Sequence, residues 1–269
     1  MERGVSGRGM PERRMVLGLW LDSLTIEQTV ARCIDAVEDG DNLTIGVVNA
    51  AKIVKMRRDE RLRRAVLGCD LILADGQSVV WASRLAGSHL PERVAGIDLL
   101  QALLPEAALR GYRVYFLGAR PEALRRMLDA VEEAYPTLQI AGARDGYYSA
   151  AEAPAVAQEI RDAKADLLFL GMSSPKKELF EQRWGPRTGA HVVHGVGGSF
   201  DVLAGEVRRA PLWWRKHGLE WLYRAIQEPL RLGPRYLTTN VQFIALVAIE
   251  VLRRKLLRRH SPTSVRQEG

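Results

Sequence analysis

Short apolar runs with the composition of strands alternate with helical runs over most of this chain, and no other feature limits its fold as strongly. The strand-like runs lie at residues 16–21, 43–48, 70–73, 113–117, 138–143, 166–171 and 191–195. Helical periodicity marks residues 23–37, 50–67, 78–86, 97–109, 121–135, 150–163 and 175–184. Such an alternation predicts βαβ units, which build a parallel sheet with helices on its faces. The sequence therefore predicts an α/β fold with a Rossmann-like parallel sheet flanked by helices.

The character of the chain changes after residue 206. The segment 207–260 carries no strand signal and is rich in Trp, Arg and Leu. Because proline lacks the N–H that a helix interior needs, we expect Pro229 and Pro234 to divide this segment into short helices. The predicted organisation has a flexible N-terminal tail, an α/β core, a helical membrane-associating appendage and a disordered C-terminal tail, at residues 1–14, 15–206, 207–260 and 261–269.

The chain has a formal net charge of +7, which favours acidic partners such as nucleic acids, phosphates or an anionic membrane surface. Apolar side chains share one helical face over residues 236–252, and a basic cluster follows at 253–259. This pattern fits a helix that lies in a membrane interface. The alternative is an amphipathic helix packed on the core or on a second copy.

Two absences bear on localisation. No apolar run is as long as the stretch of about 20 residues that is needed to span a bilayer. Residues 1–14 also lack the apolar region of a signal peptide. We therefore expect a cytoplasmic protein that binds peripherally to the inner face of the cell membrane.

The loops that follow the predicted strands are where chemistry is expected, because ligands of open α/β sheets bind beyond the carboxyl ends of the strands. Asp75 directly follows the predicted strand 70–73 and precedes Gly76. A carboxylate in this place is a candidate general base for an acceptor hydroxyl. The alternative is that Asp75 caps the helix that follows.

Two glycine-bearing loops follow other strands. Gly118 and the run at 195–198 would let backbone N–H groups approach a diphosphate at a helix start. Tight turns alone would explain the same glycines. Neither loop matches the glycine fingerprint of dinucleotide-binding proteins or of P-loops, so a nicotinamide-dependent oxidoreductase is poorly supported.

Metal-binding and redox chemistry have no clear sequence signal. The five histidines and the two cysteines show no metal-ligand spacing, and no suitable loop carries Asp-x-Asp. We expect Cys33 and Cys69 to be buried free thiols and His194 to be structural. The prediction is a reaction that needs no metal and no cofactor.

Several stretches in these loops together resemble one family. They are 48–50 (VNA), 74–76 (ADG), 91–99 (PERVAGIDL), 116–122 (FLGARPE), 145–148 (DGYY), 174–178 (SPKKE), 195–201 (GVGGSFD), 209–211 (RAP), 218–224 (GLEWLYR) and 228–229 (EP). In this order they are similar to the TagA/WecG/CpsF glycosyltransferases, glycosyltransferase family 26. The resemblance covers residues 17–236.

The resemblance implies an inverting, metal-independent transfer of a hexose-type sugar. The donor would be a UDP-sugar and the acceptor a polyprenyl-diphosphate-linked saccharide of cell-surface polysaccharide synthesis. It also implies that the appendage closes over the site and directs the enzyme to the membrane. A homo-oligomer is compatible with the family.

The same resemblance assigns residues. Asp75 matches the general base and Asn49 a polar substrate contact. The remaining substrate contacts are predicted at Lys177, Arg209, Arg224, Arg231 and Arg235. The nucleotide is predicted to bind at Gly118, Ala119, Arg120, Glu122, Gly195, Gly197 and Gly198.

The chain departs from the family pattern at three positions. Val47 stands where the family often has Thr, Lys177 where it usually has Gln, and Pro234 where it often has Arg, with Arg235 adjacent. These changes leave the donor open, with glucose or a uronic acid among the choices. The alternative functions are a basic nucleic-acid-binding protein, which lacks a recognised motif here, and the less supported oxidoreductase.

Overall fold

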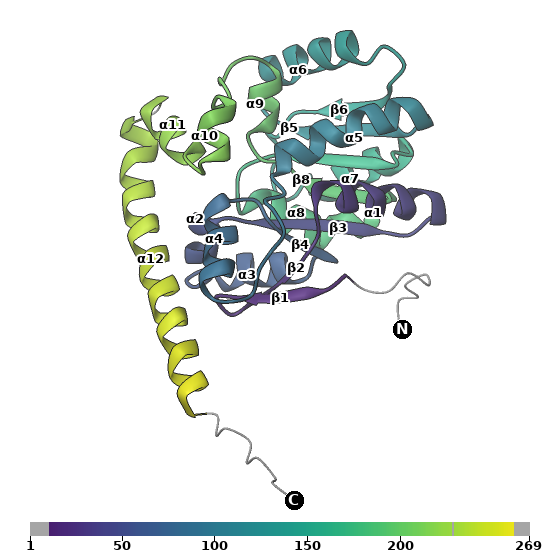
Figure 1. Cartoon of the computed structure of the whole chain (residues 1–269). Coiled ribbons are helices and arrows are strands. Elements are labelled where there is room, and N and C mark those ends of the chain that lie inside the picture. Colours follow the sequence, from purple (N-terminus) through teal and green to yellow (C-terminus); the bar gives the residue numbers. More distant parts are fainter. Residues whose placement is uncertain (1–10, 228, 261–269) are drawn as a thin grey trace, which may run out of the picture.

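The computed structural model describes residues 11–227 and 229–260, although not the side chains of residues 216, 224, 229–237 and 257–260. Its centre is a parallel sheet of six strands in the order β4-β3-β8-β7-β5-β6 (Figure 1). The strands are β3 (Leu43–Val48), β4 (Leu71–Ala74), β5 (Arg113–Gly118), β6 (Gln139–Arg144), β7 (Leu167–Gly171) and β8 (Val192–Gly195). The predicted α/β, Rossmann-like architecture is confirmed.

Helices cover both faces of this sheet, because successive strand residues point to opposite sides. On one face Phe116 and Phe169 pack with Phe200, under α1 (Ile26–Asp39), α5 (Gly96–Arg110), α6 (Pro121–Ala134) and α9 (Ser199–Leu203). On the other face Tyr115 and Leu168 pack under α7 (Ala153–Asp162) and α8 (Lys176–Trp184). The short 3-10 helix η1 (Gly185–Arg187) follows α8.

A further apolar cluster lies beside β3 and β4. It contains side chains of α2 (Ala50–Met56), α3 (Glu60–Leu67) and α4 (Gln77–Leu85), and it reaches Phe243 of the C-terminal helix. Cys33 and Cys69 are buried free thiols, as predicted.

The predicted single strand over residues 16–21 is wrong. The chain forms instead a two-stranded antiparallel hairpin of β1 (Arg13–Val16) and β2 (Leu19–Asp22). Its two turn residues, Leu17 and Gly18, have φ values of 51° and 80°. Two left-handed residues are what a two-residue hairpin turn requires, and the leucine masked this turn in the sequence.

Two helix boundaries also differ from the prediction. Asp22 lies in β2 and Thr25 caps α1, in a capping box with Gln28. The predicted helix over 50–67 is two helices, because the chain leaves the helix after Met56 and Asp59 caps α3. Arg13 and Arg14, assigned above to the N-terminal tail, belong to β1.

The appendage consists of α10 (Leu212–Lys216), α11 (Glu220–Gln227) and α12 (Pro229–His260). Pro229 marks a boundary as predicted, since α11 ends at Gln227 and α12 begins at Pro229, but Pro234 does not, because this helix of 32 residues continues through it. Proline is tolerated at the first helical position, where no N–H is needed. The one N–H that Pro234 lacks is near the start of a helix that packs against α2.

In Figure 1 α12 runs along one side of the core, past α2 and α4. None of the helices in the described part of the chain is both long and apolar enough to cross a membrane. The predicted tails at residues 1–10 and 261–269 lie outside the described residues.

Candidate active site

A cleft of about 1920 Å³ opens at the carboxyl ends of β3, β4, β7 and β8. The strand-end loops form its floor, and α4, α11 and α12 contribute its walls. A second hollow, of about 970 Å³, adjoins it and shares residues 171–173 with it. The cleft therefore lies where ligands of open parallel sheets are expected.

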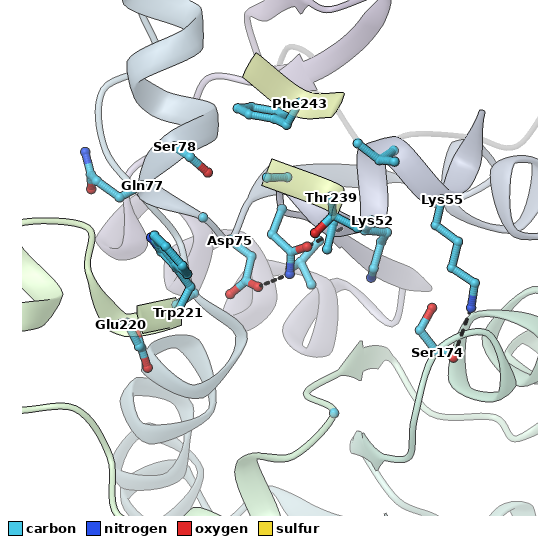
Figure 2. A pocket seen from close by; sticks show the side chains of 18 of the residues that line it. Lys52, Lys55, Asp75, Gln77, Ser78, Ser174, Glu220, Trp221, Thr239 and Phe243 are labelled. Atoms are coloured by element: carbon cyan, nitrogen blue, oxygen red, sulfur yellow. Dashed lines mark hydrogen bonds between the residues drawn. The ribbon is translucent and has the colours of Figure 1, made fainter. Parts of the chain in front are cut away.

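Asp75 lies in this cleft, one residue beyond β4 (Figure 2). One oxygen of its carboxylate accepts a hydrogen bond from the side-chain amide of Asn49, and the other accepts one from the backbone N–H of Gly96, both at 3.2 Å. The helix cap is a different residue, Gly76, and α4 has no side-chain cap hydrogen bond. The capping alternative for Asp75 is therefore wrong, and its half-buried carboxylate faces the cleft.

Asn49 serves two purposes at the end of β3. Its Oδ1 accepts a hydrogen bond from the N–H of Lys52 at 3.0 Å and so caps α2, while its amide nitrogen holds Asp75. A Cβ on Gly76 would lie only 3.1 Å from the Cβ of Asn49, so the two strand-end loops are in close contact. This packing fixes the amide relative to the carboxylate.

His194 lies beneath the site and is completely buried. Its two ring nitrogens lie 3.4 Å from the carbonyl oxygen of Ile45 and 3.3 Å from that of Gly96. Burial lowers the pKa of His194 to about 4, so the ring is neutral at neutral pH. The predicted structural role agrees with this environment. The ring contacts the carbonyl group of Gly96, the residue whose N–H donates to Asp75.

Four buried ionisable side chains form a cluster under the glycine loop. Lys52 Nζ lies 2.7 Å and Lys177 Nζ 3.5 Å from the same oxygen of Glu178. Lys177 also donates a hydrogen bond of 2.7 Å to the carbonyl oxygen of Gly195. Glu181, the fourth member, is 2 % exposed. The cluster thus ties α2 and α8 to the end of β8.

Burial and charge move the pKa values of this cluster in different directions. Burial acts to raise the pKa of Glu178, but the two ammonium groups outweigh it and lower that pKa to about 2. Burial raises the pKa of Glu181 to about 8. Burial, together with the charge of Lys52, lowers the pKa of Lys177. At neutral pH Glu178 is therefore ionised and Glu181 is largely protonated.

The glycines predicted to contact the nucleotide have packing constraints of their own. Gly118 has a φ of 145°, and a Cβ there would lie 2.4 Å from the backbone of Gly171. A Cβ on Gly195 would lie 2.7 Å from Lys177 Nζ. The close approach of β5 and β7 therefore requires a glycine at 118, whereas the neighbour of Gly195 is the end of a flexible side chain.

The second hollow contains side chains suited to a nucleotide. Tyr147, 71 % exposed, offers a ring on which a base can stack. Lys176 Nζ donates to the carbonyl oxygens of Gly146 and Tyr148, both at 2.8 Å. Arg120 donates to Glu206 at 2.9 Å and lies at the rim with Ala119.

The structure brings together only part of the predicted site. The predicted residues that line the cleft or the second hollow are Asn49, Asp75, Ala119, Arg120, Lys177, Gly195, Gly197 and Gly198. Glu122 is exposed on α6 and lines neither space. Arg209 pairs with Asp98 and donates to Gln101 at 3.0 Å, on α5. The side chains of Arg224, Arg231 and Arg235 lie outside the part that the structure describes.

Sequence reasoning missed several side chains of the cleft. Arg93 donates to Glu220 at 2.8 Å and to Asp98 at 3.1 Å, so it joins the loop before α5 to α11. Trp81, Trp221, Thr239 and Phe243 line the walls. In Figure 2 Asp75 lies among side chains from α4, α11 and α12. Arg93 lies in a quoted motif, whereas the wall residues had no signal beyond composition.

Within the described residues no group of three His, Cys, Asp or Glu side chains is placed to hold a metal ion. A family model described as the glycosyl transferase WecG/TagA/CpsF family matches residues 14–257.

Two similar curated proteins bear the name N-acetylglucosaminyldiphosphoundecaprenol N-acetyl-beta-D-mannosaminyltransferase. The protein from Bacillus spizizenii is 34% identical over 186 residues, which are 67% of this chain and 72% of that protein. The protein from Bacillus subtilis is 36% identical over 162 residues, 60% of this chain and 62% of that protein. The solved structure of a periplasmic substrate-binding protein from Ralstonia solanacearum aligns with 94% of this chain and with 76% of the length of that protein, at 16% identity. Its TM-score of 0.31 is too low to carry an argument. The extent of the family match and the identity of the first relative show that this chain belongs to the WecG/TagA/CpsF family of glycosyl transferases.

Proposed function

We propose that this chain transfers a hexose-type sugar from a UDP-sugar to a polyprenyl-diphosphate-linked saccharide, with inversion and without a metal ion. The observation that carries the proposal is the carboxylate of Asp75, which two N–H donors hold facing a large cleft. The names of the two curated relatives support a lipid-diphosphate acceptor.

In the proposed reaction the acceptor hydroxyl oxygen attacks the anomeric carbon of the donor sugar. The bond between that carbon and the diphosphate oxygen breaks, UDP leaves with the bonding electron pair, and the hydroxyl proton passes to Asp75. A base positioned by neighbouring groups contributes about 10²–10⁴-fold to such a step. Inversion follows because acceptor and leaving group occupy opposite faces of the sugar.

We assign the nucleotide to the second hollow and the donor sugar to the adjoining floor of the cleft. Tyr147 would stack on the base, and Arg120 and Lys176 would supply positive charge near the diphosphate. Asn49 and Lys177 remain the proposed sugar contacts on the floor. Arg209, Arg224, Arg231 and Arg235 remain proposed substrate contacts of the appendage, and Arg209 also pairs with Asp98.

The proposal also places the enzyme at the inner face of the cell membrane. The outer face of α12 exposes Val241, Ile249 and Leu256 to between 54% and 60%, and Arg253 and Lys255 lie beside them. An exposed apolar stripe with basic neighbours fits an interfacial helix. The core of residues 15–206 would then hold the donor, and the appendage would present the acceptor.

The test is a donor screen with the full chain. A panel of UDP-sugars is supplied with a polyprenyl-diphosphate-linked N-acetylglucosamine, with and without EDTA, and the release of UDP is followed. We expect acceptor-dependent release with one donor, unchanged by EDTA. Release that EDTA abolishes would contradict the metal-independent mechanism, and the absence of acceptor dependence with every donor would contradict the proposed acceptor class.

A further inference from the structure

One arm of the cleft leads away from Asp75 between α4 and α12. The α4 residues that line it recur every three or four positions and so share one face of the helix. They are Gln77, Ser78, Trp81, Ala82 and Leu85. The α12 residues that line the cleft include Thr239, Asn240, Phe243, Val247, Ala248, Val251 and Leu252. The two lining faces make a groove, which we call the α4–α12 groove.

The polarity of this groove changes along its length. Polar side chains line the part near Asp75, where Gln77 and Ser78 begin α4 and Thr239 lies on α12 (Figure 2). Apolar side chains line the remainder, up to Leu85 and Leu252. Residues 239–252 of α12 extend over about 20 Å at the rise of an α-helix. The groove is therefore long, with one polar and one apolar end.

Large apolar side chains in this groove remain exposed. Trp81 is 43% exposed, Leu85 67% and Leu252 60%. Exposed apolar area costs free energy in water, at about 25 cal/mol per Å². Side chains exposed on concave surfaces of this kind commonly mark ligand sites.

Polar contacts hold the far end of the groove open. Arg254 of α12 donates to the carbonyl oxygen of Ala86 at 2.6 Å, to Ser88 Oγ at 2.7 Å and to the carbonyl oxygen of Met15 at 2.9 Å. At the near end Phe243, 5 % exposed, is packed into the core. The spacing of α4 and α12 is thus fixed at both ends, and the groove does not close on its own apolar side chains.

We infer that the α4–α12 groove binds the first units of the polyprenyl chain of the acceptor. This inference rests on the proposed function, because the chain must start from a diphosphate and sugar at the polar end near Asp75. A hydrocarbon chain has no polar groups, so it leaves none without a partner in an apolar groove, whereas a peptide would leave its backbone N–H and C=O groups unpaired. A bilayer would instead meet the adjoining exposed face of α12, with Ile249 and Leu256.

The test fills the groove from α12. Ala248 and Ala245 are both exposed on this helix, but only Ala248 lines the groove. Ala248→Trp should block the apolar arm, and Ala245→Trp is the matched control that adds the same ring to the outer face. Both variants should melt within a few degrees of the parent, because neither side chain is buried.

Transfer is measured with two acceptors that share the diphosphate and sugar, one with a long polyprenyl tail and one with a short alkyl tail. We expect Ala248→Trp to raise the KM of the long-tailed acceptor about tenfold, equivalent to about 1.4 kcal/mol, and to leave that of the short-tailed acceptor nearly unchanged. Ala245→Trp should change neither. Equal effects on both acceptors, or equal effects of both variants, would overturn the inference.

A binding measurement separates this inference from the proposed function. Neutral phosphatidylcholine vesicles with and without polyprenyl phosphate are titrated with each protein, and tryptophan fluorescence is followed. The parent and Ala245→Trp should bind more tightly when polyprenyl phosphate is present, and Ala248→Trp should lose this difference. If no donor supports transfer but the difference persists, the groove stands and the proposed reaction fails. If transfer occurs while Ala248→Trp keeps the difference, the groove assignment fails alone.

Discussion

The floor of the cleft and its helical wall face the same space but are held in different ways. On the floor, Asp75, Asn49 and His194 each contact backbone atoms or side chains fixed by the strands. The wall of α10–α12 is joined to the core by apolar packing and by a few arginine contacts, among them those of Arg93, Arg215 and Arg254. The floor thus has the rigidity that chemistry requires, whereas the wall depends on a few contacts.

One loop contacts both regions. Arg93, in the loop before α5, holds Glu220 of the wall. The same loop continues to Gly96, whose N–H supports Asp75. A displacement of the wall therefore has a short covalent path to the proposed base, and the comparison can be tested by breaking floor and wall separately.

The largest effect is expected on the floor, from Asp75→Asn. An amide cannot accept the acceptor proton, so kcat should fall about 10²–10⁴-fold while the melting temperature stays close to that of the parent. Asp59→Asn is a matched control, because Asp59 lines the same cleft but caps α3, a role that Asn also performs. Steady-state UDP release measures both. A comparable fall in kcat in the two variants would contradict the proposed role of Asp75 as the base.

Lys177→Met breaks the buried cluster of the floor. It removes the donor to the carbonyl oxygen of Gly195 and one of the two cations near Glu178. Loss of one partner from a buried ion pair costs about 3–5 kcal/mol, and here Lys52 keeps the cost near the lower figure. Urea unfolding should show this loss, whereas Lys55→Met, at an exposed lysine that donates to Ser174 O at 3.3 Å, should cost under about 1 kcal/mol. Similar costs for the two lysines would contradict the buried cluster.

Glu181 gives the floor a pH dependence. Burial raises its pKa from 4.5 to about 8, so the folded protein keeps a proton that the unfolded chain releases above pH 4.5. The free energy of unfolding therefore falls as pH rises from 4.5 to 8, and Glu181→Gln removes this contribution. Between pH 6.5 and 8 the parent should lose about 1–2 kcal/mol relative to the variant. Parallel urea midpoints for both proteins over this range would contradict a protonated Glu181.

The floor could largely be predicted from the sequence, and the wall could not. Strand runs place Asn49 and Asp75 at one edge of the sheet, because parallel strands all end there. Residue order alone does not show that a loop arginine meets α11, as Arg93 does with Glu220. The groove was also hidden, since it needs the relative placement of α4 and α12. Composition predicted a helical appendage, but a proline rule that applies to isolated helix interiors wrongly divided α12.

For the predicted site residues, the position in the chain could likewise be predicted from the sequence, but the neighbouring side chains could not. Gly118 and Gly195 had two explanations each, and the backbone of Gly171 accounts for the first glycine by packing alone, whereas only the end of the Lys177 side chain adjoins the second. Arg209 was assigned to substrate from its motif, yet it pairs with Asp98 on α5. Motif position fixes where a residue lies in the chain, but its role depends on which partner is closest in space.

The smallest effect is expected from Glu220→Gln, which weakens the contact between wall and floor. The side chains of Arg93 and Glu220 are only 13% and 15% exposed, so water screens this pair little. Its charge-assisted hydrogen bonds therefore contribute more free energy than those of an exposed surface pair. Replacing the carboxylate by an amide keeps the shape and should cost about 1 kcal/mol, or about a fivefold rise in the KM of the acceptor. Because Asp75 keeps both of its donors, kcat and the KM of the donor should change less than twofold. Glu106→Gln, which weakens the more exposed pair with Arg110 on α5, is the control and should change neither constant. A fall in kcat without a change in acceptor KM would mean that the wall acts on the base itself, and the division of labour between floor and wall would then be wrong.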